Sequence, residues 1–96
     1  MSYLDHTAQT IRDAVSPDLV PAEADLEQLF LLYAVLARAK GLTTTASDVH
    51  DAWVAWMLAR GKEHEAIRPY DELDPDTASQ DVPFVEAIRR VAADSG

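Results

Sequence analysis

Apolar positions recur at helical spacing along most of the chain. In residues 3–15 they form one face of a helix, made of Leu4, Ala8, Ile11 and Val15. Ser2 stands before this run as an N-cap, and Pro17 ends it. The pattern therefore predicts a first helix over residues 3–15, followed by a stiff connection over residues 16–21 that contains two prolines.

The most apolar segment of the chain covers residues 22–40. One stripe consists of Leu26, Leu29, Phe30, Tyr33, Leu36 and Ala37, and a second consists of Leu31, Leu32 and Val35. A helix that is apolar on most sides is typical of the middle of a bundle. Gly41 follows this segment as a left-handed C-cap.

Residues 46–60 predict a third helix. Thr45 and Asp48 have the spacing of a capping box, and Gly61 marks the end. Its inward stripe comprises Val49, Trp53, Trp56 and Met57. Trp53 and Trp56 are therefore expected on one face.

Two further helix starts come from an acidic residue followed closely by proline, at Asp74-Pro75 and Asp81-Val82-Pro83. They predict a short turn of helix near residues 75–80 and a last helix with a buried face made of Phe84, Val85, Ile88, Val91 and Ala92. We find no alternating strand pattern and no internal repeat. The prediction is an all-α protein, a compact bundle of about four principal helices in a single domain over residues 1–96.

The chain has 96 residues and a formal charge of −9, with about −5 in residues 1–30, +1 in 31–60 and −5 in 61–96. An acidic surface repels phosphate groups, so neither direct nucleic-acid binding nor binding to an anionic membrane is expected. With no cysteine, leader pattern or long apolar stretch, a cytoplasmic location is predicted. Because helix 22–40 is so apolar, we also expect that a homodimer could bury its excess surface.

The only imidazoles are His6, His50 and His64, and their spacings do not match a helical metal-binding motif. A small metal-dependent hydrolase would need His50 and His64 to share a carboxylate. No serine stands in a nucleophile-elbow context, and no glycine-rich phosphate loop is present. We therefore predict no catalytic residue, no metal, no cofactor and no enzymatic activity.

Trp53 and Tyr70 have two interpretations. Aromatic residues at helical spacing usually build a core, but Tyr70 could also close a small aromatic pocket over Trp53 and Trp56. His50 is interpreted as a partly buried helix residue, and His64 as a cap or turn former near Tyr70.

Seven carboxylates lie between residues 63 and 81, and their spacing does not fit a calcium loop. Asp71, Asp74 and Asp81 all sit where helix starts favour an anion, so N-capping together with solvation explains them. The alternative is an acidic surface for a basic partner.

From Val49 onward, the sequence resembles the RyR domain, the module named for repeats in ryanodine receptors. The matching residues are Val49-His50, Trp53, His64, Pro69-Tyr70-Asp71-Glu72-Leu73 and Asp81, within residues 49–94. Met57 stands where a basic residue is usual, and Gly61-Lys62-Glu63 forms a shorter connection. The whole chain also resembles small uncharacterised helical proteins of actinobacteria and their phages. The RyR resemblance implies a ligand-sensing role, since prokaryotic modules of this kind have been proposed to sense nucleotide-derived ligands.

These observations favour a small non-enzymatic module that binds a protein partner or a small ligand. The candidate binding residues are His50, Trp53, His64, Tyr70, Asp71 and Asp81. In this hypothesis the aromatic rings give apolar contact, a histidine gives a switchable polar contact, and the carboxylates steer the ligand. The alternative is an acidic phage-type inhibitor that mimics nucleic acid, whose binding should fall steeply with added salt.

Overall fold

The computed structural model describes residues 2–20 and 25–95, and these residues form an all-α fold. The helices are α1 (Tyr3–Ala14), α2 (Leu26–Ala39), α3 (Ala46–Ala59), α4 (Pro75–Ser79) and α5 (Val82–Ser95), with 3-10 turns η1 (Pro17–Leu19), η2 (Gly41–Thr43) and η3 (Tyr70–Glu72). No strand occurs within the described ranges. The predicted fold class, with four principal helices and a short fifth one, is confirmed.

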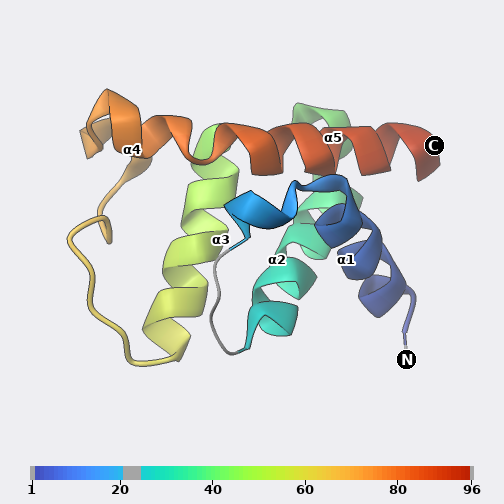
Figure 1. Cartoon of the computed structure of the whole chain (residues 1–96), viewed down its shortest axis with the longest axis horizontal. Coiled ribbons are helices and arrows are strands. Elements are labelled where there is room, and N and C mark those ends of the chain that lie inside the picture. Colours follow the sequence, from blue (N-terminus) through green and yellow to red (C-terminus); the bar gives the residue numbers. More distant parts are fainter. Residues whose placement is uncertain (1, 21–24, 96) are drawn as a thin grey trace.

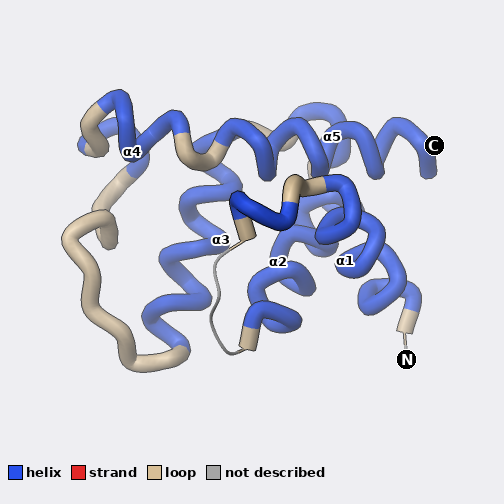
Figure 2. The backbone as a smooth tube through the Cα atoms, in the orientation of Figure 1, coloured by secondary structure: helices blue, strands red, loops and turns tan. Residues whose placement is uncertain are grey.

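Helix α5 lies across one end of α1, α2 and α3 (Figure 1). Helix α1 packs against α2, and α3 lies on the other side of α2. The chain from the end of α3 to α4 runs as an irregular segment outside α3 (Figure 2). The region enclosed by α3, this segment and the start of α5 is therefore built by residues far apart in the sequence.

The core is formed where the predicted apolar faces of the four long helices meet. Its largest fully buried apolar side chains are Ile11, Leu29, Phe30, Val49 and Ile88. Phe30 contacts Tyr33 edge to face, with ring centroids 5.4 Å apart. Burial of these side chains is the dominant stabilising term of the fold, about 1.5 to 3 kcal/mol for each large apolar side chain.

The predicted ends of the first and third helices agree with the structure to within one residue. Helix α1 stops at Ala14, with Val15 as its C-cap, and α3 stops at Ala59, with Arg60 as its C-cap. The second helix was predicted to begin at residue 22, and residues 22–24 lie outside the described residues. At Asp25 the prediction is wrong, because this residue is the N-cap of α2, with a left-handed φ of 64°, and the helix begins at Leu26.

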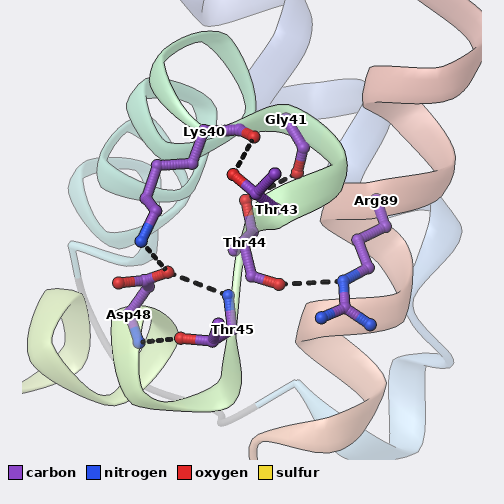
Figure 3. A network of polar contacts seen from close by, with 7 residues as sticks. All are labelled: Lys40, Gly41, Thr43, Thr44, Thr45, Asp48 and Arg89. Atoms are coloured by element: carbon purple, nitrogen blue, oxygen red, sulfur yellow. Dashed lines mark hydrogen bonds and ion pairs between the residues drawn. The ribbon is translucent and has the colours of Figure 1, made fainter.

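Capping boxes begin two of the long helices. At α3, the Thr45 hydroxyl accepts the Asp48 N–H, and the Asp48 carboxylate accepts the Thr45 N–H. Lys40 forms an ion pair of 2.7 Å with the same carboxylate (Figure 3). These contacts, with that of Lys40 the largest, lower the pKa of Asp48. The box at α1 pairs Ser2 with Asp5 in the same way.

A polar network fixes the corner between α2 and α3 onto α5 (Figure 3). Gly41 has a φ of +55°, so a left-handed residue follows α2 as predicted. Thr44 is buried, and its hydroxyl donates to the Gly41 carbonyl at 2.8 Å. The Arg89 Nε of α5 donates to the Thr44 carbonyl, also at 2.8 Å. A buried backbone carbonyl therefore has a partner, as a stable corner requires.

Candidate ligand-binding pocket

A pocket of about 790 Å³ lies beside α3, on the side where the chain returns through residues 64–81. One wall comes from α3, and the opposite side from the 64–68 segment, α4 and the start of α5. Residues of α2 and η1 also border it. Its volume falls in the range of small-molecule binding sites, roughly 300 to 1,000 Å³.

His50 joins α3 to the returning segment. Its Nε2 lies 2.7 Å from the Arg68 carbonyl oxygen, which can only accept a hydrogen bond, so Nε2 carries the proton. The other nitrogen, Nδ1, lies 3.8 Å from the Asp81 carboxylate. His50 is thus held in one orientation, with one nitrogen towards the backbone and the other towards an acidic group.

Trp53 lies between two imidazoles on the pocket wall. Its ring stacks on His50 with centroids 5.7 Å apart, and His64 meets it edge on at 5.4 Å. The Nδ1 of His64 accepts the Ala66 N–H at 3.0 Å, which confirms that His64 shapes a turn. Trp53 is half-buried and borders the pocket, so part of its ring surface is available for contact.

Asp81 is a half-buried carboxylate at the point where α5 begins. Burial raises its pKa to about 6, and the nearby His50 acts in the opposite direction. Tyr33, on α2, is only 2% exposed, and its pKa is raised by burial and then by the charge of Asp81. Asp81 therefore interacts with α3 on one side and with α2 on the other.

Three predicted N-caps have different outcomes. Asp74 caps α4, because its carboxylate accepts the Thr77 N–H at 2.8 Å. Asp71 is not an N-cap, because Pro69 holds that position, but it lies exposed in the first turn of η3, where an anion is expected. The backbone carbonyl of Asp81 accepts from the first turn of α5, whereas its side chain faces His50.

Four of the six candidate site residues line the pocket: His50, Trp53, His64 and Asp81. Tyr70 and Asp71 are not among the residues that border it. The Tyr70 ring lies 6.1 Å from that of His50, so it supports the imidazole. Tyr70 does not close the pocket over the tryptophans, as one interpretation of the sequence proposed.

Trp56 belongs to the core, although it is only three residues from Trp53. It is 2% exposed, and its indole N–H donates to the Asp25 carbonyl at 3.0 Å. Both tryptophans pack on the core cluster, Trp56 within it and Trp53 at its edge, where Trp53 also borders the pocket.

Tyr33 and Phe84 are pocket-lining aromatics that the sequence analysis assigned only to buried helix faces. Their rings contact each other, with centroids 5.7 Å apart. A tyrosine hydroxyl in an otherwise apolar stripe was a usable signal, since buried hydroxyls need a polar environment. The Arg68 carbonyl carried no signal, because any residue type supplies that group.

The histidine and acidic side chains of residues 2–20 and 25–95 do not form a metal site. No group of three or more of them is arranged to hold a metal ion. The shared carboxylate site that the metal-dependent hydrolase hypothesis requires is therefore not found in these ranges.

Within the same ranges, no helix combines the length and apolar character needed to cross a membrane.

Comparison with known proteins gives a family but no function. A family described as Domain of unknown function (DUF7701) matches residues 2–93. No curated protein and no solved structure gave a significant match. Because the match covers nearly the whole chain, the protein belongs to the DUF7701 family.

Proposed function

We propose that this DUF7701 member is a small non-enzymatic binding module, RyR-like in its C-terminal half, that takes a small ligand in the pocket beside α3. The observation that carries this proposal is the convergence of His50, Trp53, His64 and Asp81 on one pocket. These four residues come from three separate parts of the fold.

The composition of the pocket supports a small ligand. Recognition sites for small molecules combine an aromatic or apolar wall with a few oriented polar groups. Here Trp53 and Phe84 supply the wall, and His50 supplies an imidazole held by its bond to the Arg68 carbonyl. A pocket whose polar group is already oriented loses less entropy on binding.

A protein partner, a homodimer and a cytoplasmic location remain predictions. The homodimer has less support than the sequence suggested, because α2 covers most of its apolar side chains against the rest of the chain. Val35, 47% exposed, is the most accessible large apolar residue of α2, and Leu31, Leu32 and Leu36 are partly buried. Size-exclusion chromatography with light scattering tests self-association, and a monomer at high concentration would contradict it.

The acidic-inhibitor alternative has weaker support than ligand binding. The carboxylates of Asp5, Asp48 and Asp74 each accept a backbone N–H at a helix start, from Ser2, Thr45 and Thr77 respectively. Carboxylates used as caps stabilise helices and are not free to imitate a row of phosphates.

An NMR screen tests the proposed function. Three sets of small metabolites, matched in size and bearing positive, negative or no charge, are added at millimolar concentration to ¹⁵N-labelled protein. We expect at least one set to shift the signals of His50, Trp53 and Asp81. Trp53→Ala should abolish these shifts, and Leu58→Ala, a control at an exposed position of the same helix, should keep them. If no set shifts the pocket signals, the proposal is contradicted.

A further inference from the structure

The charge around the pocket is strongly negative. Among the described residues, five carboxylates border it, and these belong to Asp18, Glu65, Glu72, Asp74 and Asp81. Arg68 is the single lysine or arginine that borders it within the described ranges, and its Nε donates to the Glu65 carbonyl. When the two imidazoles are neutral, the five carboxylates and one guanidinium of these described residues give a net charge of −4. A concave site with one sign of charge concentrates ligands of the opposite sign.

The pocket contains two polar groups without a hydrogen bond to any described residue, the Asp81 carboxylate and the Tyr33 hydroxyl. The Asp81 carboxylate is 3.8 Å from His50, beyond hydrogen-bond distance. Within the described part of the chain, neither this carboxylate nor the Tyr33 hydroxyl makes a hydrogen bond. All fully enclosed side-chain nitrogen and oxygen atoms described there do have partners. The Tyr33 hydroxyl must therefore reach accessible space, and Tyr33 borders the pocket.

The pocket also has aromatic surface for the apolar part of a ligand. Trp53 and Phe84 both border it, and within the described residues neither ring has a guanidinium or ammonium group over it, unlike Trp56, which the Arg60 guanidinium covers at 4.3 Å. An apolar group packed on these rings adds contact area beside the charged end of the ligand.

We propose that the pocket binds a small organic cation, whose ammonium or guanidinium group lies beside Asp81 and the Tyr33 hydroxyl while its apolar part packs on Trp53 and Phe84. This inference rests on the proposed function and names the ligand class of the same site. Aromatic walls together with carboxylates match an organic cation better than magnesium or calcium, which prefer oxygen ligands alone.

The cation should bind more weakly as the pH falls. Asp81 must be ionised to pair with it, and binding in turn favours loss of the Asp81 proton. The other titratable or charged groups facing this part of the pocket are His50 on α3, Tyr33 on α2, Asp18 on η1, and His64, Glu65, Arg68, Glu72 and Asp74 on the returning segment. Protonation of either histidine adds positive charge, so it acts in the same direction as protonation of Asp81.

Three probes of similar shape test the ligand class with the full chain. They are 2-phenylethylamine, 3-phenylpropionate and 2-phenylethanol, which are a cation, an anion and a neutral molecule at pH 8. We expect the amine to shift the Trp53 indole signal saturably and to bind at least tenfold more tightly than the other two. Agmatine provides the guanidinium version of the test, and magnesium or calcium chloride alone should leave the signal unchanged.

Two variants assign the effect to the pocket. Asp81→Asn should weaken amine binding at least tenfold at pH 8 and remove most of its decline between pH 8 and pH 5. Asp76→Asn removes an exposed carboxylate of α4 that does not border the pocket, so it should leave binding unchanged. Far-UV circular dichroism verifies that both variants are folded. Glu72→Gln, at an exposed lining position, gives a second and smaller loss.

The outcomes separate the two proposals. If the anion or the neutral probe binds in the pocket as tightly as the amine, the cation inference is wrong but the binding function stands. If magnesium or calcium gives the same shift, the ligand is not specifically an organic cation. If none of the probes affects the pocket and the metabolite screen is also negative, both proposals fail.

Discussion

The two tryptophans of α3 lie in two different regions of the molecule. Trp56 is inside the core, with its indole N–H bonded to the Asp25 carbonyl and the Arg60 guanidinium over its ring. Trp53, one helical turn earlier, is half-buried between His50 and His64 on the wall of a pocket. Trp56 is therefore almost fully covered, whereas Trp53 keeps part of its ring surface in a pocket that titratable residues also border.

This difference shows what aromatic spacing does and does not determine. Periodicity places both rings towards the inside of the fold, and both do contact other elements. Whether a ring is fully covered depends on the segment that packs over it. Over Trp53 that segment is the irregular chain at residues 64–68, which leaves room beside the ring.

The largest expected effect compares the two rings directly. Trp56→Ala should lower the free energy of unfolding by about 3 to 5 kcal/mol, because it leaves a cavity in the core. Trp53→Ala should cost about 2 kcal/mol or less, because part of that ring is already in contact with solvent. Urea unfolding followed by circular dichroism measures both values. Equal losses would mean that Trp53 is as much part of the core as Trp56.

The next largest effects come from two helix caps, Thr45 at the start of α3 and Asp74 at the start of α4, which borders the pocket. Thr45→Ala removes the capping box of α3 and should cost about 1 kcal/mol of global stability. Asp74→Ala removes the cap of α4, a five-residue helix with no buried residue, so its global cost should be less than half as large. Hydrogen exchange should instead show faster opening at residues 75–79. If Asp74→Ala lowers the global free energy of unfolding as much as Thr45→Ala does, α4 does not open independently of the rest of the protein.

Asp81 gives a smaller effect with a defined pH dependence. Its raised pKa means that the folded state favours the protonated form. This contribution to stability is complete below the unfolded value near 3.8, and is lost as the pH rises through about 6. Asp81→Asn should therefore be more stable than the parent at pH 8, by less than about 1 kcal/mol because the group is partly solvated.

The same variant should show little difference from the parent at pH 4. Thermal unfolding at pH 4, 5, 6, 7 and 8 measures the trend. Asp48→Asn is the control with the opposite sign, since contacts with Lys40 and Thr45 lower the pKa of Asp48. Asp48→Asn should be less stable than the parent at pH 7, and this stability difference should shrink as the pH falls below 4. If the stability difference between Asp81→Asn and the parent does not change with pH, the raised pKa of Asp81 is contradicted.

The smallest expected effect concerns Tyr70. Its ring contacts His50 but does not border the pocket, so Tyr70→Phe should change stability by less than about 0.5 kcal/mol and leave ligand binding intact. Titration of the variant with 2-phenylethylamine measures this. Lost binding with an unchanged melting temperature would place the Tyr70 hydroxyl in the site.

Most of the fold followed from local signals in the sequence. The Thr45–Asp48 box, the Asp74-Pro75 start and Gly41 each act within a few residues, so they could be recognised without the structure. The site was predicted only in part. His50, Trp53, His64 and Asp81 were candidates, but their meeting depends on the path of the irregular segment, which no periodicity describes. Tyr33 was missed as a site residue because its spacing is that of a core residue.

Acrylamide quenching of single-tryptophan variants shows whether Trp53 faces an open pocket while Trp56 is enclosed. Trp56→Phe leaves Trp53 as the single tryptophan, and Trp53→Phe leaves Trp56. In folded protein we expect strong quenching of Trp53 fluorescence and weak quenching of Trp56 fluorescence. Equal protection of both rings would contradict this expectation.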